Sequence, residues 1–132
     1  MPALTRSAPY FPVTDVLDMV DHYEKVFGFR REYVGGEPPE FAIVSRDGLP
    51  IMLRRVGNAA DIRPNAAQGG AWDVFFWVRD LDALATELVD AGATLVYAPV
   101  VQEAYGMKEF AVRDPAGYVL GFGENLGKGG ED

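Results

Sequence analysis

The side chains available for chemistry are few in type, which limits the sites that this chain can build. It has no cysteine, and His22 is its only histidine. Disulfides, thiolate ligands, a cysteine nucleophile and any site needing two histidines from one chain are therefore excluded. His22 falls within an amphipathic helical pattern, and we interpret it as a packed helix residue rather than a catalytic one. A transition-metal site is not expected.

Aromatic and charged residues alternate along two apolar runs and suggest a binding surface instead. Asp73, Phe75 and Trp77 stand at every second position, as do Met52 and Arg54. Because side chains alternate between the two faces of a sheet, each set shares one face. Trp77 and Phe75 can stack on a planar ligand. Asp73 can pair with a cation or accept a hydrogen bond, and Arg54 can pair with Asp73 or with an anionic ligand.

These runs belong to two halves of the chain that repeat one pattern. VTDVLDMVDHYEKVFGF and VRDLDALATELVDAGAT each contain a strand end, an aspartate, an amphipathic helix and a glycine stop. Asp15 and Asp80 are expected to cap the two helices, which end at Gly28 and Gly92. Runs with strand composition follow each helix, such as FAIVS and EFAVR.

The repeat predicts an α+β fold. Two tandem βαβββ modules are expected to form a cupped, mostly antiparallel sheet, with the helices on its outer face. Module one is expected at about residues 5–57 and module two at about 72–124, joined by a polar, glycine-rich linker at about 58–71. The tail, about 125–132, is expected to be disordered. Residues 1–132 are thus predicted to form a single domain, large enough to be stable without disulfides or bound metal.

Alternation within the strands assigns the face opposite the helices. Phe11 and Val13 should lie under the first helix, so Tyr10 points into the cup. Tyr105 lies in a loop at the rim of the cup, where it can close over a ligand. The candidate ligand-binding residues are therefore Tyr10, Met52, Arg54, Asp73, Phe75, Trp77 and Tyr105.

Charge and hydropathy exclude several partners. The net charge of −8 excludes a basic nucleic-acid-binding surface. We interpret the surplus carboxylates chiefly as keeping the protein soluble, although they also favour a cationic partner. No apolar run reaches the ~20 residues that a membrane span needs, and the N-terminus lacks a signal-peptide core. We therefore expect a cytoplasmic protein that binds neither nucleic acid nor membrane.

The two-module pattern resembles the vicinal oxygen chelate superfamily (glyoxalase/bleomycin resistance protein/dioxygenase) over about residues 4–124. The segments LTRSAP, WVRDLDAL and YGMKEFAVRDPAG are most similar to its bleomycin-resistance branch. Metal enzymes of the superfamily carry their ligands at the positions of Ala8, Met52, Asp73 and Gly121. Because only Asp73 offers a carboxylate, the resemblance implies no metal and no other cofactor.

The resemblance also implies a function. Proteins of the bleomycin-resistance branch are non-catalytic homodimers, with an exchanged N-terminal strand, that hold drug in clefts at the dimer interface. The chain is thus expected to sequester a small aromatic or cationic ligand, such as a bleomycin-type antibiotic. The alternative is a small-metabolite enzyme with a degenerate or non-standard metal site, in which Asp73 is the base and Arg54 holds an anionic intermediate. The lack of a second acid or base at a convincing spacing favours the binding protein.

Overall fold

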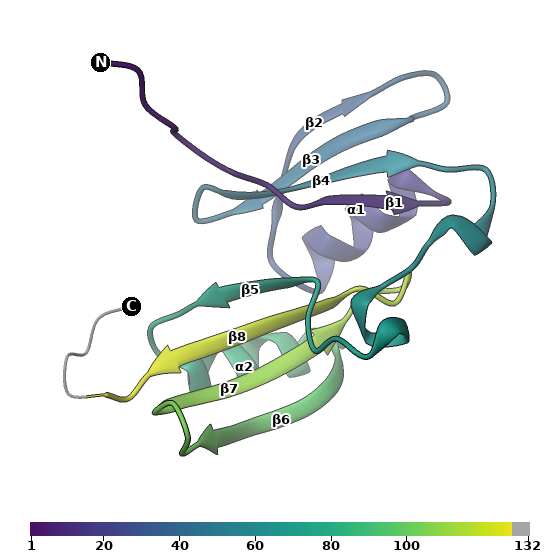
Figure 1. The fold of residues 1–132 in the computed structure, drawn as a ribbon. Coiled ribbons are helices and arrows are strands. Elements are labelled where there is room, and N and C mark those ends of the chain that lie inside the picture. Colours follow the sequence, from purple (N-terminus) through teal and green to yellow (C-terminus); the bar gives the residue numbers. More distant parts are fainter. Residues whose placement is uncertain (128–132) are drawn as a thin grey trace. The chain divides into compact units, whose positions relative to one another are not determined.

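Each half of the chain forms a βαβββ module, which gives the predicted α+β fold (Figure 1). The structure, a computed structural model, describes residues 1–127. It divides into two units at residues 63 and 64, inside the segment predicted as a linker. That segment holds two 3-10 helices, Ala59–Asp61 and Asn65–Gln68. Of the predicted tail, Asn125 still belongs to the last strand, and residues 128–132 lie outside the described residues.

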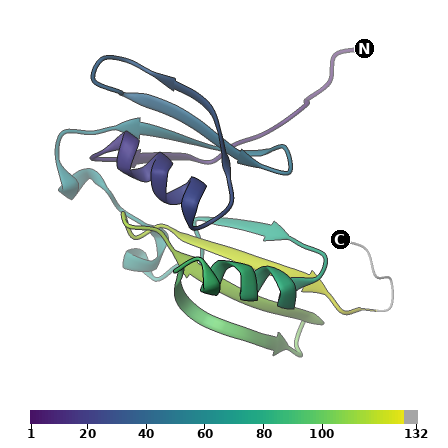
Figure 2. The same cartoon turned by 180° about the vertical axis from the view of Figure 1, so that it is seen from behind.

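The first module is a mixed four-stranded sheet with one helix. Its elements are β1 (Tyr10–Val13), α1 (Val16–Lys25), β2 (Arg30–Gly35), β3 (Phe41–Arg46) and β4 (Leu49–Arg55). The strand order is β1-β4-β3-β2, with β1 parallel to β4 and the other neighbours antiparallel. The helix covers one face (Figure 2). Asp15 caps it as predicted, because its Oδ1 accepts the Asp18 N–H at 3.0 Å.

The core of the first module lies between this sheet and α1. Phe11 and Val13 of β1 are buried there, which agrees with the alternation predicted for the strand. The helix contributes a buried stripe, which consists of Val16, Met19, Val20 and Tyr23. The opposite face of the sheet therefore remains available for other contacts.

The second module repeats the plan. Its elements are β5 (Val74–Trp77), α2 (Leu81–Asp90), β6 (Thr94–Gln102), β7 (Met107–Arg113) and β8 (Val119–Asn125). The strand order is β5-β8-β7-β6, with β5 parallel to β8 and the other neighbours antiparallel. Phe76, Phe110 and Phe122 stack on one another beneath α2, so the residues at alternate positions face away from the helix.

The start of α2 is capped differently from the prediction. Asp80 occupies the N-cap position, but its side chain makes no capping hydrogen bond. Its backbone is left-handed (φ 60, ψ 56) rather than extended, so the side chain does not reach the free amides of the first turn. Glu124 of β8 replaces it: Oε1 accepts the Leu81 N–H at 3.0 Å, and Oε2 accepts the Asp80 N–H at 3.3 Å.

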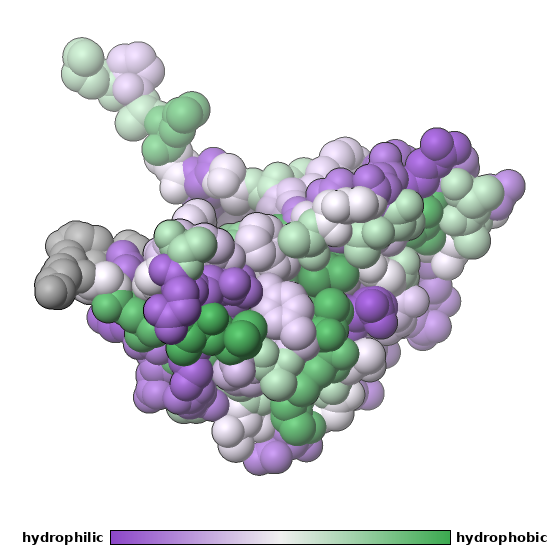
Figure 3. Space-filling model, turned by 60° about the horizontal axis from the view of Figure 1, so that its bottom comes forward, coloured by the Kyte–Doolittle hydropathy of each residue, from purple (hydrophilic) through white to green (hydrophobic). Residues whose placement is uncertain are grey.

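The residues before β1 form an exposed arm, which stands clear of its module in Figure 3. Leu4 is exposed, whereas Arg6 is tied to β2 by two bonds to Glu32, from Nη1 to Oε2 at 2.9 Å and from Nη2 to Oε1 at 3.2 Å. The Arg6 guanidinium holds the pKa of Glu32 at about 2. Neither helix within residues 1–127 is long and apolar enough to cross a membrane.

Candidate ligand-binding site

The face of the second sheet that turns away from α2 carries a cluster of aromatic rings. Trp72, Phe75 and Trp77 form this aromatic cluster, with ring centroids 4.7 Å apart for Trp72 and Phe75 and 5.1 Å apart for Phe75 and Trp77. Trp77 is 59% exposed. An exposed indole beside a second ring can stack on a planar molecule, so this face can bind an aromatic ligand.

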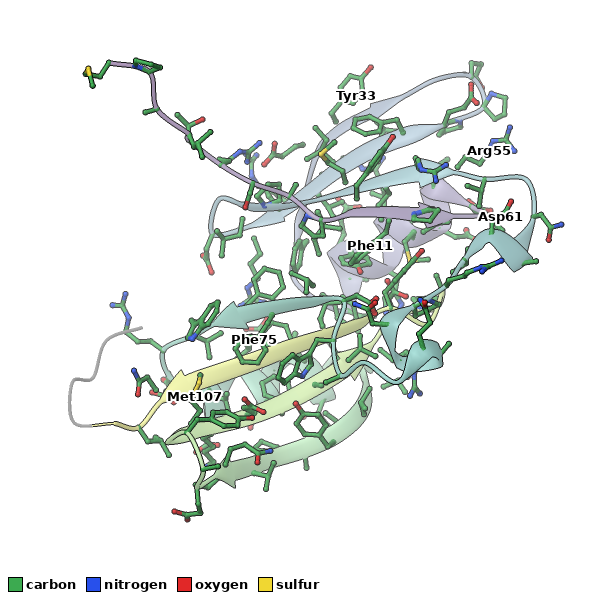
Figure 4. The ribbon with its side chains drawn as sticks, in the orientation of Figure 1. Phe11, Tyr33, Arg55, Asp61, Phe75 and Met107 are labelled. Carbon is green, nitrogen blue, oxygen red and sulfur yellow. The ribbon has the colours of Figure 1, made fainter. Side chains whose placement is uncertain are left out.

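Two glycines of β8 make room for the cluster. A Cβ on Gly121 would lie 2.6 Å from Trp72 Nε1 and 2.8 Å from Phe75 Cδ1. A Cβ on Gly123 would lie 2.6 Å from both Phe75 Cζ and Met107 Cε. Figure 4 shows Phe75 and Met107 on this sheet. The rings thus rest directly on the backbone of β8, in space that any larger residue would occupy.

Asp73, one residue before β5, uses both carboxylate oxygens on the backbone of its own module. Oδ1 accepts the Asn65 N–H and Oδ2 accepts the Val119 N–H, each at 2.8 Å. Asn65 Nδ2 also donates to the Trp72 carbonyl at 2.8 Å. Asp73 therefore fastens the 3-10 helix and the start of β8 to the start of β5. It holds Trp72 and Phe75 in place from the side.

A buried carboxylate lies on the same face. Glu109 of β7 is 1% exposed. Trp72 Nε1 donates to the Tyr97 hydroxyl at 2.9 Å, and that hydroxyl donates to Glu109 Oε1 at 3.4 Å. The Tyr105 hydroxyl, from the turn between β6 and β7, also hydrogen-bonds to Glu109. Aromatic rings and one carboxylate are thus joined in a single network.

The two tyrosines of this network remain protonated donors. Burial raises the pKa of Tyr97; the hydrogen bond from Trp72 opposes this effect, and the charge of Glu109 adds to it. Partial desolvation of its hydroxyl and the hydrogen bond to Glu109 raise the pKa of Tyr105. Tyr105 is 54% exposed, so its ring is also accessible to a ligand.

The first sheet presents a second aromatic face, away from α1. Tyr10 and Met52 lie opposite each other in register, as do Phe41 and Arg54. The Arg54 guanidinium lies over the Tyr10 ring, 5.7 Å from its centroid, which is a cation–π contact. Tyr33, 54% exposed, has its ring 6.1 Å from that of Phe41 (Figure 4). This face can also contact a planar molecule.

His22 belongs to neither face. Its ring packs edge-on against Phe27, with centroids 4.8 Å apart. Burial lowers the pKa of His22, and its Nε2 is buried with no hydrogen-bond partner among the described residues. It is a neutral packing residue at ordinary pH.

The four positions at which metal enzymes of this fold hold their ion do not fit a metal here. Ala8 and Met52 supply no oxygen or nitrogen side chain. Both oxygens of Asp73 accept backbone N–H groups, and the space beside Gly121 is filled by Trp72 and Phe75. Among residues 1–127, no group of three His, Asp or Glu side chains is arranged to hold an ion.

Comparisons with known proteins agree with this fold. Residues 7–122 match the profile of the Glyoxalase/Bleomycin resistance protein/Dioxygenase superfamily. The chain belongs to this superfamily. A search of curated protein sequences gave no significant match.

Three solved structures share the fold of this chain. TioX from Micromonospora sp. ML1 is 23% identical, with a TM-score of 0.72 over 92% of this chain and 98% of that chain. The bleomycin-binding protein of Streptomyces verticillus, in complex with copper(II)-bleomycin, is 25% identical, with a TM-score of 0.69 over 97% of this chain and 100% of that chain. A glyoxalase-related enzyme from Clostridium phytofermentans is 14% identical, with a TM-score of 0.76 over 95% of this chain and 98% of that chain.

The structure divides the predicted site residues between the two sheets. Tyr10, Met52 and Arg54 lie on the open face of the first sheet, and Phe75 and Trp77 lie on that of the second. Asp73 stands at the edge of the second face, and Tyr105 in the adjoining turn. The predicted set did not include four further residues of these faces, Tyr33, Trp72, Tyr97 and Glu109. Alternation from Phe110, which faces α2, assigns Glu109 to the open face and was the available signal.

Proposed function

We propose that this member of the glyoxalase/bleomycin resistance superfamily is a non-catalytic binding protein for a small aromatic ligand. The observation that carries the proposal is the exposed Trp77, which is backed by Phe75 on a sheet face free of its helix. A bleomycin-binding protein is among the solved structures with this fold. We extend the proposal to a homodimer with the ligand in a cleft at the interface, and to the two modules acting as one domain.

The contacts of Asp73 favour binding over catalysis. A general base must lie within hydrogen-bond reach of the proton that it removes from the substrate. Asp73 directs one oxygen to each of two backbone amides, and these bonds fix its carboxylate in a structural role. The only histidine, His22, packs against Phe27 in the first module and does not lie on this face. The alternative, an enzyme with Asp73 as base, predicts turnover that Asp73→Asn abolishes.

A fluorescence titration with metal-free bleomycin tests the proposal. Trp72 and Trp77 are the only indoles, so quenching reports on this face. We expect saturable quenching with one ligand per chain. Trp77→Ala removes the exposed ring, keeps Trp72 as the reporter, and should weaken binding by about 5- to 150-fold, as stacking contributes ~1–3 kcal/mol.

Two controls complete the experiment. Tyr33→Ala removes a ring of similar exposure from the other sheet. It tests whether the ligand binds the second sheet specifically or any exposed aromatic ring. Light scattering should give twice the mass of one chain. If planar aromatic ligands leave the fluorescence unchanged, or bind Trp77→Ala as tightly as the unmodified protein, the second sheet is not the site.

A further inference from the structure

Glu109 is an unusual residue for the place it occupies. Its carboxylate is buried on a sheet face that also carries aromatic rings, Met107 and the backbone of Gly121 and Gly123. Within residues 64–127, its hydrogen bonds come from the hydroxyls of Tyr97 and Tyr105, and no Lys, Arg or His side chain pairs with it. Its neighbour Lys108 is engaged elsewhere, with Asp82 at 2.9 Å. A buried carboxylate is normally paired with a cation, so a positive group is missing.

The tyrosine bonds leave room for such a group. An ionised carboxylate has about four lone-pair positions, and two neutral donors occupy half of them. The raised pKa values of Tyr97 and Tyr105 keep both hydroxyls protonated, so both can donate to the carboxylate between them. The network therefore orients a negative charge without neutralising it.

The register places this charge beside the exposed indole. Trp77 pairs with Gly123 of β8, and Gly123 pairs with Glu109 of β7, so the three stand in one row across the sheet. At ~4.8 Å between strands, Trp77 and Glu109 are about 10 Å apart at their backbones. Between them, Gly123 carries no side chain, and the space above it is filled by Phe75 and the flexible Met107.

We propose that Glu109 binds the protonated amine or guanidinium of a ligand whose planar ring stacks on Trp77. The cation would form a charge-assisted hydrogen bond to the carboxylate and lie among the rings of Phe75, Tyr97 and Tyr105, which favour cations over their faces. This inference rests on the proposed function, because it uses Trp77 as the stacking platform. It narrows the ligand class from planar aromatics to aromatic amines and guanidines.

Two probes of matched shape test the inference by calorimetry. Naphthylmethylamine carries a protonated amine at neutral pH, and naphthylmethanol replaces it with a neutral hydroxyl. We expect the amine to bind the unmodified protein about 10- to 100-fold more tightly than the alcohol, as charged hydrogen bonds in buried sites do. Glu109→Gln keeps the shape of the side chain and should reduce this preference to within about twofold.

The controls separate this inference from the proposal beneath it. Glu103→Gln removes the same charge from the exposed turn nearby and should keep the preference for the amine. If both probes bind the unmodified protein equally, or if the preference survives Glu109→Gln, the role of Glu109 is refuted and the aromatic site stands. If neither probe binds, both proposals fail. If Glu109→Gln does not fold, the ratio of the affinities of the unmodified protein for the amine and the alcohol tests the proposal by itself.

Discussion

The close contact between β8 and the aromatic cluster makes Gly121→Ala a sharp test of the structure. The added Cβ would lie 2.6 Å from Trp72 Nε1 and closer still to Trp72 Cδ1, whereas ordinary van der Waals contact begins at 3.4 Å, so the indole must move by more than 0.8 Å. Phe75, at 2.8 Å, prevents an easy sideways shift. Overpacking of this kind costs about 1–3 kcal/mol.

A second cost follows from the network. Moving the indole strains its 2.9 Å hydrogen bond to Tyr97, which is worth about 1 kcal/mol. Alanine regains about 0.4–1 kcal/mol by restricting the unfolded chain, since Gly121 does not have a positive φ. The net prediction is a free energy of unfolding lowered by about 1–3 kcal/mol, or roughly 4–12 °C in Tm at this chain length.

Urea unfolding, followed by tryptophan fluorescence, measures this change in the module that holds both indoles. Gly57→Ala is the matched control, because nothing lies within 4 Å of its Cβ and its φ is not positive. It should stay within about 0.5 kcal/mol of the unmodified protein. Equal stability of the two variants would show that Trp72 and Phe75 do not occupy the space beside Gly121. A larger side chain at this position, such as a glutamate, would have to displace Trp72.

Two further predictions concern carboxylates outside the aromatic cluster. Glu124→Ala removes the acceptor of the Leu81 and Asp80 N–H groups and should lower the free energy of unfolding by about 1 kcal/mol, whereas Glu103→Ala in an exposed turn should not. Glu32 has its pKa lowered from 4.5 to about 2 when folded, so its contribution is complete above about pH 4.5 and is lost as the pH falls towards 2. Glu32→Gln should therefore show a smaller decrease in melting temperature between about pH 5 and pH 3 than the control variant Glu103→Gln. If the melting temperatures of the two variants fall in parallel with pH, the pair between Glu32 and Arg6 does not persist in solution.

The module plan could be predicted from the sequence because its signals are local. Asp15 and Gly28 mark the ends of α1 within one helix length, and strict alternation in β1 separates Tyr10 from the buried Phe11. The cap of α2 was predicted wrongly because its acceptor comes from another element. Glu124 lies 44 residues from Asp80 in the chain, and no local pattern reveals such a partner.

The candidate site was harder to predict for the same reason. The alternation along β5 put Phe75 and Trp77 on one face, but the bonds that engage Asp73 reach 46 residues to Val119. Glu109 was concealed by its strand, in which four successive residues from Glu109 to Val112 are buried. Alternation from Phe110 assigns Glu109 to the open face, but a strand buried on both sides does not show from its sequence that this carboxylate is buried among rings.

The position of β8 within its sheet has a consequence for how the protein is made. It is the last strand of its module, yet it lies between β5 and β7, and β4 has the same inner position in the first module. On the ribosome, the first module has all its strands once Arg55 has been added, whereas the second lacks its inner strand until Asn125. Until then, Asp73 lacks the Val119 amide and α2 lacks its cap. The two halves, although alike in plan, should therefore fold one after the other. While the second half is incomplete, its apolar strands are exposed to aggregation or to chaperones.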